Sequence, residues 1–375
     1  MRICAVAIVA VLVADGVVVA LRLDGDDGRR VPPALEQVVL ELEAFVERER
    51  GQRFERPVDV RLVSDDRFED AVRRLRRRDA GGDDEDGERV FVGLFRALGL
   101  VEGDFDPSAI EEDSDERILG FYDPESDRLL VRGSRPTPAV RRVLVHELTH
   151  ALDDQHFGLE RPELDERDDE AAIAFQSLVE GVAVRIEARY HASLSPEERR
   201  QAEIDGDPPS GTGPAVPRVF EALLAFPYEA GEALVDALLR EGGSPRLDAA
   251  LIDPPVSTEA VLHPERFVAG DGPKPVRTPE PAGEPVDGGV LGELILRLVL
   301  QSSVDRATAA RAAEGWGGDR YVAWFDGDRL CMKAAVVMDT PPDRAELVAG
   351  LRRWADRHAG AAVTDTDPVT FTRCG

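Results

Sequence analysis

The sequence predicts an α+β protein that is predominantly helical, contains a small antiparallel sheet with a hairpin edge strand, and divides into two lobes. Most segments place apolar residues at helical spacing. A few short segments have the composition of strands, and they come in adjacent pairs separated by turn residues, as in antiparallel hairpins. Residues 206–217 are rich in Gly and Pro and form a joint between the two lobes.

The composition is that of a folded, acidic protein. The chain has 375 residues, of which 43% are hydrophobic, so it can bury a full core. Its net charge is −28, because 74 Asp and Glu outnumber 46 Lys and Arg. Nucleic acids and anionic lipids are bound through clustered basic residues. The sequence therefore predicts no nucleic-acid partner and no peripheral binding to anionic lipid.

Residues 1–22 are expected to be a signal peptide or a single-pass membrane anchor rather than part of the fold. Residues 3–21 are apolar with Asp15 as the one charge, Arg2 provides a positive start, and residues 18–20 are small enough for cleavage. The stretch is also just long enough to span a bilayer, although Asp15 would cost about 2.5–3.5 kcal/mol there. Both forms predict an exported protein, either extracellular or membrane-anchored with its domain outside the cytoplasm.

The elements of the first half are expected in the order helix, strand, two helices, hairpin and two long helices. Pro33 begins the first helix, and Gly51 ends it. Thr137 and Pro138 are typical of the N-cap and first turn of a helix, so the first long helix begins there. The predicted segments are helices at 33–50, 67–78, 88–100, from 138 onward and 170–190, a strand at 58–62, a solvated loop at 83–86, and hairpin strands at 117–122 and 128–132.

The second half is expected to be mainly helical and to end in a small disulfide-linked β region. Residues 270–289 are dense in Pro and Gly and are predicted to be a linker. The chain then consists of a leader at 1–22, an N-terminal lobe at 30–205 and a C-terminal lobe at 217–375. Within the last lobe we expect helices at 219–241, 290–300 and 343–358, two strands around Asp326-Gly327, and a final strand.

Cys331 and Cys374 are expected to form a disulfide. Cys331 lies in the strand-like run 330–338 and Cys374 follows the strand-like run 369–372, and pairing of these strands would bring the two sulfurs within bonding reach. Disulfides persist in the oxidising compartments that exported proteins occupy. The alternative is two free thiols.

One segment, His146-Glu147-Leu148-Thr149-His150, carries a recognisable chemistry. Residues four apart lie on one face of a helix, so both imidazoles can bind one metal ion while Glu147 polarises a bound water. The chain has only 6 His, so about 0.01 chance matches to this pattern are expected. The pattern predicts a Zn²⁺ site with His146 and His150 as ligands and Glu147 as the general base.

The helix around this segment is expected to separate a metal-binding face from a packing face. His146, His150 and Asp153 share one stripe, whereas Leu148 belongs to an apolar stripe on another side. Asp153 and Asp154 are candidates for holding the free N–H of a ligand imidazole.

The third ligand of a catalytic zinc site is predicted to be Glu180. This carboxylate lies in the apolar stretch 178–184, where burial is costly unless the group is paired or bound to metal. Gly181 would allow the helix that carries Glu180 to approach the helix of the two histidines closely.

Two other residues remain alternatives for this ligand. His156 has the spacing of a third histidine ligand, but it would point away from the metal if the helix continues past Asp153. Glu170 follows two acids and is expected at a solvated helix start, where acids favour the helix dipole. Glu187 lies between two arginines and is expected to be a surface acid.

These motifs resemble those of known zinc peptidases. Residues 146–151 with Asp154 resemble the active-site helix of thermolysin-like gluzincins. The chain is more similar to a family of exported, mostly uncharacterised bacterial and archaeal zinc-peptidase-like proteins. That family combines a Gly-Phe-Tyr-Asp hairpin, a His-Glu-Leu-Thr-His helix and a later Leu-Val-Glu-Gly. Here they stand at 120–123, 146–157 and 178–181.

The resemblance implies a zincin-like fold with two lobes around an active-site cleft, a Zn²⁺ cofactor, and a peptide or protein substrate bound along the hairpin edge. A zinc-activated water would hydrolyse the peptide bond with Glu147 as general base. His263 and Tyr228 are candidates for the additional donor to the oxyanion, because both follow the lobe joint, where a cleft wall would lie. The alternative is a catalytically inert zincin-fold envelope protein with a binding or scaffolding role. The intact Glu147 favours the enzyme.

Overall fold

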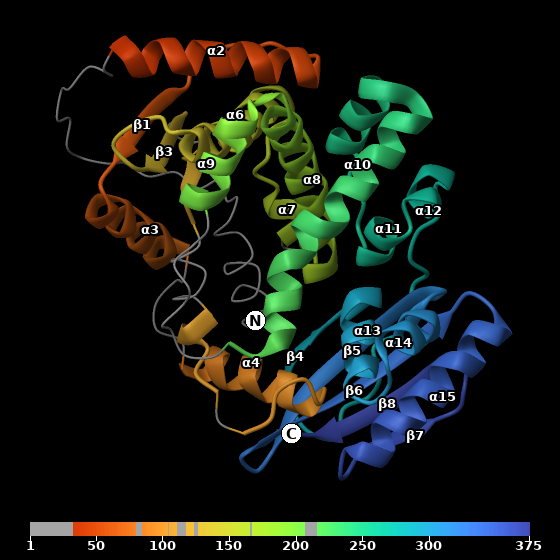
Figure 1. The fold of residues 1–375 in the computed structure, drawn as a ribbon. Helices are drawn as coiled ribbons and strands as arrows, with labels where there is room; N and C mark the ends of the chain where they lie inside the picture. Colours follow the sequence, from red (N-terminus) through yellow and green to blue (C-terminus); the bar gives the residue numbers. More distant parts are fainter. Residues whose placement is uncertain are drawn as a thin grey trace.

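The computed structural model describes residues 33–79, 85–103, 105–110, 118–123, 127–165, 167–206 and 216–375. The protein is a mixed α+β structure, mostly helical with two small sheets, so the predicted α+β class is confirmed. In Figure 1 most helices and the small sheet of the first half occupy the upper part of the molecule, and the C-terminal sheet with its helices, drawn in blue, lies below, beside the helix at residues 85–97.

The first half contains the predicted succession of elements, with small shifts at their ends. The helix expected at 88–100 already begins at Glu85, inside the predicted loop 83–86, and it ends at Ala97. The elements are α2 (Pro33–Arg50), β1 (Asp59–Val63), α3 (Asp65–Asp79), α4 (Glu85–Ala97), β2 (Gly120–Asp123), β3 (Arg128–Arg132), α6 (Pro138–Phe157), α7 (Pro162–Asp165), α8 (Asp169–Ser193) and α9 (Pro196–Gly206).

The first sheet is mixed, with strand order β1-β3-β2. β2 and β3 form the predicted antiparallel hairpin, and β2 is an edge strand of the sheet. β1 pairs with β3 in parallel, so the expectation of a purely antiparallel sheet is wrong here. β1 precedes β3 by two helices in the chain, and this long connection allows the parallel pairing.

The second half contains more strand than expected. The predicted linker 270–289 ends in a strand, β4, and the helix expected to end at 241 continues to 252 with a kink at Gly243, whose φ of +67° is not helical. The elements are α10 (Arg218–Ile252), α11 (Thr258–Leu262), α12 (Pro264–Ala269), β4 (Pro285–Gly289), α13 (Gly292–Gln301), α14 (Arg306–Ala313), β5 (Trp316–Asp326), β6 (Arg329–Met338), α15 (Pro341–Arg357), β7 (Ala362–Thr364) and β8 (Val369–Cys374).

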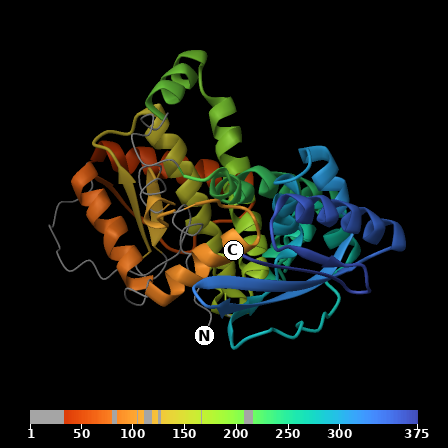
Figure 2. The same cartoon turned by 90° about the horizontal axis from the view of Figure 1, so that it is seen from below.

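These strands form a five-stranded antiparallel sheet with order β4-β5-β6-β8-β7. Figure 2 shows this sheet as a layer at the lower edge of the molecule, with the helices of the same segment above it. α4, from the first half of the sequence, also packs on β6. The Trp354 indole in α15 donates to the backbone oxygen of Leu98 at 3.0 Å, which ties this part of the first half to the C-terminal sheet.

The Cys331–Cys374 disulfide is present, as predicted. The two cysteines are directly opposite each other in the β6–β8 ladder, so strand pairing places them together.

Reduction and alkylation of this disulfide are expected to lower the free energy of unfolding by up to about 4 kcal/mol, because a cross-link over a sequence separation of 43 residues restricts the unfolded chain. Urea denaturation of the oxidised and the alkylated protein would measure the difference. Identical unfolding midpoints would contradict the expected stabilisation.

Helix α8 packs between α6 and α10. Its contact with α10 depends on Gly181 and Gly231, because a Cβ on Gly181 would lie 2.3 Å from the carbonyl of Gly231. Gly181 was expected to permit a close approach to the helix that carries the two histidines, and this expectation is wrong, because its close partner is α10.

Gly231→Ala is expected to destabilise the protein by about 3 kcal/mol, because the added Cβ would lie 1.9 Å from the backbone oxygen of Ser177 and only a backbone shift can relieve that contact. Gly272→Ala is a matched control, since its Cβ would meet nothing within 4 Å. Unfolding in urea would compare the two variants with the unmodified protein. Equal stability of both variants would refute this account of the helix contact.

The predicted leader at residues 1–22 lies outside the described residues. Within the part of the chain that the structure describes, no helix has the length and apolar character needed to cross a membrane. The predicted joint at 206–217 likewise lies mostly outside the described part.

Candidate metal centre

His146 and His150 lie one turn apart on α6, and Glu180 lies on α8 beside them. Thr137 caps α6, and Pro138 follows in its first turn, as the sequence predicts; the helix continues unbroken to Phe157. The neighbouring α8 presents Glu180 to the two imidazoles. The structure thus brings together the three residues that we predicted as metal ligands.

The three side chains form a compact and buried group. The Nε2 atom of His146 lies 3.1 Å from Oε2 of Glu180, and Nε2 of His150 lies 3.6 Å from the same oxygen. One potential ligand atom from each residue lies within 4.8 Å of the others. The exposed fractions are 9% for His146, 2% for His150 and 0% for Glu180.

This group has the chemistry of a zinc site. Two imidazoles and one carboxylate are a ligand set that zinc takes in catalytic sites. Nε2 of His150 and Oε1 of Glu180 are buried and have no hydrogen-bond partner among the described residues. Such atoms are costly to bury unless something binds them, and a metal ion would bind both.

The ionisation state of Glu180 also suits metal binding. Burial alone would raise the pKa of Glu180, but His150 and His146 outweigh burial and hold that pKa at about 2, so the carboxylate stays ionised. Burial would lower the pKa of His146, but hydrogen bonds to Glu180 and Glu187 raise it well above its ordinary value. Because a metal must displace that proton, metal affinity should fall in acid.

Neither alternative third ligand joins the group. Nε2 of His156 lies 2.7 Å from the backbone oxygen of Arg53, on another side of α6. Glu170 is 2% exposed and accepts hydrogen bonds from the backbone N–H and the hydroxyl of Thr258. The expectation that Glu170 lies at a solvated helix start is therefore wrong, because α11 covers it.

Glu187 binds the outer nitrogen of His146, a role for which Asp153 and Asp154 were the candidates from the sequence. Its Oε2 lies 3.2 Å from Nδ1 of His146, and its Oε1 accepts a hydrogen bond from Arg142 at 2.7 Å. Glu187 is thus not the simple surface acid that its two neighbouring arginines suggested. It follows Glu180 by seven residues, and this two-turn spacing on one helix face was the signal available in the sequence.

Asp153 and Asp154 bind elsewhere. Asp153 is buried against Arg50, whose Nε donates to it at 2.6 Å. Asp154 accepts hydrogen bonds from the hydroxyl of Tyr122 and the backbone N–H of Leu159. Both acids therefore anchor the second half of α6 to its surroundings. The predicted separation of a metal-binding face from a packing face is also wrong, since α6 is buried on both.

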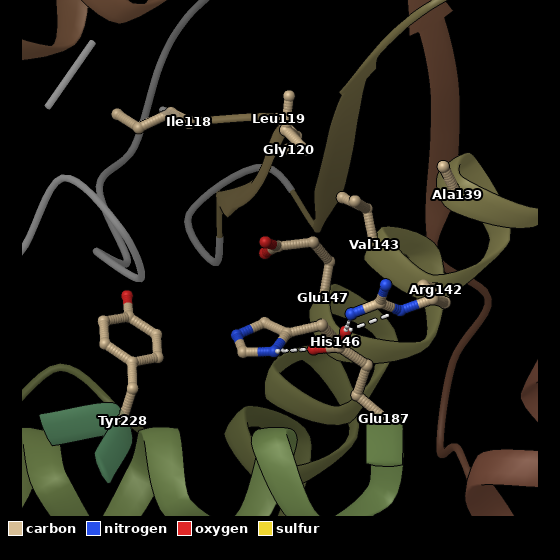
Figure 3. Close-up of a pocket in the computed structure, with 10 residues that line it drawn as sticks. All are labelled: Ile118, Leu119, Gly120, Ala139, Arg142, Val143, His146, Glu147, Glu187 and Tyr228. Atoms are coloured by element: carbon tan, nitrogen blue, oxygen red, sulfur yellow. Dashed lines mark hydrogen bonds and ion pairs between the residues drawn. The ribbon is translucent and has the colours of Figure 1, made fainter. Parts of the chain in front are cut away.

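A cavity of about 280 Å³ opens beside His146 and Glu147. Figure 3 shows the Glu147 carboxylate directed into this cavity, with the Tyr228 ring on the opposite wall. The Tyr228 ring lies 6.4 Å from that of His146, centroid to centroid. The other lining residues are Ile118, Leu119, Gly120, Ala139, Arg142, Val143 and Glu187.

His263 does not line the cavity. Its Nε2 lies 2.9 Å from Oε1 of Glu293 at the start of α13, so the side chain ties two helices together. We therefore assign no role to His263 in the candidate site and retain Tyr228.

The edge strand β2 reaches the cavity with backbone groups that point away from β3. The backbone N–H of Arg132 donates to the oxygen of Leu119 at 2.8 Å. Polar groups of successive residues in a strand point to opposite sides. Those of Gly120 and Tyr122 therefore point away from β3, and the backbone of Tyr122 lies near enough to the Glu147 carboxylate to offset part of the rise in its pKa that burial causes. Gly120 lines the wall of the cavity.

Replacing Glu187 with glutamine is expected to lower zinc affinity about 10- to 100-fold, because outer partners orient a ligand histidine and increase its basicity. Glu197→Gln is the control, since that side chain on α9 is 81% exposed. Competition for zinc with a chelating dye would measure both affinities. An affinity unchanged in Glu187→Gln would show that Glu187 does not support a metal ligand.

Comparison with known proteins gives little further information. Residues 280–373 match the model of a domain of unknown function, DUF8575. The matched segment is the C-terminal sheet with α13, α14 and α15, and it does not include α6 or α8. No curated protein and no solved structure matches the chain. The fold and the site thus define an α+β protein with a candidate centre of two histidines and one glutamate.

Proposed function

We propose that the protein is an exported zinc metallopeptidase with a zincin-like fold, whose two lobes flank an active-site cleft. The observation that carries the proposal is the position of Glu147. Its buried carboxylate is adjacent in sequence to a candidate metal ligand and is directed into a cavity that this ligand also lines. A purely structural metal site has no need for an acid there.

Zinc bound by His146, His150 and Glu180 would supply an acidified water and would polarise the scissile carbonyl. The chain's own groups account for the rest. Glu147 takes the proton of the water and passes it to the leaving amine. Burial raises the pKa of Glu147, which makes the carboxylate a stronger base than an exposed one. Tyr228 is the candidate donor to the developing oxyanion, since its ring forms a wall of the cavity.

The outward N–H and C=O of Gly120 support an extended peptide as the substrate. A peptide strand adds to the free edge of a sheet through its backbone groups. Glycine is needed at this position, because a Cβ would lie 2.6 Å from Val143 of α6. The strand and the active-site helix can therefore lie close enough for a bound peptide to reach Glu147.

The disulfide supports export, because disulfides form and persist in oxidising compartments. The signal peptide or membrane anchor at residues 1–22 belongs to this proposal.

Hydrolysis of casein by the zinc-loaded protein tests the proposal. We expect peptide release that stops with 1,10-phenanthroline and returns when zinc is added back. His150→Ala controls for contaminating proteases, since it removes a metal ligand. Zinc binding without hydrolysis of casein or of a peptide library would instead support the inert scaffold.

A further inference from the structure

Strand β2 contacts the active-site helix at three successive points. Gly120 lies against Val143, where even one extra carbon would clash. The backbone of Tyr122 lies beside Glu147, one turn further along α6. The hydroxyl of Tyr122 lies 3.2 Å from Oδ2 of Asp154, two turns beyond that. The strand is therefore fixed along the length of the helix, and Tyr122 provides two of the three contacts.

We propose that Tyr122 is a positioning residue that sets the register between the substrate-binding edge strand and the general base. The proposal rests on the proposed peptidase function. One strand would then position both reaction partners: Gly120 would bind the peptide backbone, and the backbone of the next outward residue, Tyr122, lies beside Glu147. A shift of β2 along α6 would move the scissile bond relative to the base.

The phenol of Tyr122 is what fixes this register. The side chain is 2% exposed, and its oxygen lies 3.0 Å from Oδ1 of Asp127 as well as near Asp154. Arg56 pairs with Asp127 at 2.6 Å and balances part of the negative charge. The Tyr122 hydroxyl thus links Asp127, which follows the hairpin turn, to Asp154 near the end of α6. Without this hydroxyl, the carboxylates of Asp127 and Asp154 would face each other across a partly buried gap.

The test uses the full chain and four proteins: the unmodified protein, Tyr122→Phe, Tyr122→Phe with Asp154→Asn, and Tyr190→Phe. Tyr190 is a matched control, because it is another buried tyrosine, packed on Phe45 and away from the cavity. In the double variant, Asp154→Asn removes one of the two negative charges that face each other and supplies an amide N–H that can donate to Asp127. The measurements are kcat and KM per bound zinc on a peptide, and amide hydrogen exchange of residues 120–123.

Tyr122→Phe should lower kcat about tenfold and change KM less, since misplacing a reacting group affects the chemical step most. Exchange at residues 120–123 should accelerate about tenfold, while zinc content stays the same. The double variant should recover most of both losses, and Tyr190→Phe should show neither. An unchanged kcat in Tyr122→Phe, or an equal fall in Tyr190→Phe, would overturn the proposal.

Hydrogen exchange separates this proposal from the proposed function. If the unmodified protein hydrolyses no peptide, the peptidase assignment fails, and exchange alone decides on Tyr122. Faster exchange that is confined to β2 and reversed in the double variant would still support its control of the strand register. Unchanged exchange at residues 120–123 would refute it.

Discussion

Replacing Glu147 with glutamine is expected to lower kcat for hydrolysis about 10²- to 10⁴-fold, while zinc stays bound. The amide preserves the shape of the side chain and cannot accept a proton from water. Glu147 lies on α6 between the two histidines and is directed into the cavity, so its replacement leaves all three metal ligands in place.

Casein hydrolysis and zinc content measured on one preparation would separate the two effects. Glu163→Gln is the control, because this acid follows α6 closely in the chain and its side chain is 62% exposed. Full activity in Glu147→Gln would rule out the proposed mechanism. Loss of zinc in that variant would mean that Glu147 supports the metal as well.

Glu180→Ala is expected to lower zinc affinity by more than about 100-fold, because two imidazoles alone leave the ion half-coordinated by solvent. The Glu180→Ala variant should nevertheless remain folded, with only a small fall in its free energy of unfolding, although its hydrolytic activity is lost. A buried carboxylate contributes little net stability once its desolvation is counted, and the two histidines can become neutral after it is removed.

His156→Ala and Glu170→Gln are the matched controls for Glu180→Ala, and both should retain zinc. Glu170→Gln should also be less stable than the unmodified protein, because Glu170 accepts two hydrogen bonds from Thr258 in a buried position. Loss of zinc in His156→Ala together with its retention in Glu180→Ala would show that the third ligand is misassigned.

The parts of the site that the sequence predicts well are local. The four-residue spacing of His146 and His150 places both on one helix face, and Thr137 with Pro138 defines where that helix begins. Cys331 and Cys374 could be paired because each belongs to a recognisable strand. In each case residues close together in the chain define the element, and for the cysteines the pairing of two such elements brings the sulfurs together.

The parts that failed depend on contacts between distant segments. Glu170 is buried by α11, which follows it by more than eighty residues. Its acidic neighbours in the chain do not reveal this contact and wrongly indicated a side chain exposed to solvent. Gly181 packs on Gly231 of α10, which follows it by fifty residues, so the sequence around Gly181 did not reveal which helix it contacts. The partner of His146 was missed because Glu187 was judged by its neighbours in the chain and not by its helix face.

The zinc content of the purified protein, measured by mass spectrometry beside that of His146→Ala, tests the central claim most directly. Both proteins would be prepared without added metal, and circular dichroism would check that the variant is folded. We expect about one zinc ion per chain in the unmodified protein and less than about one tenth of that in the variant, since a site with three protein ligands loses one of them. Absence of zinc from the unmodified protein even after reconstitution, or equal zinc in both proteins, would contradict the assignment of His146, His150 and Glu180 as a metal centre.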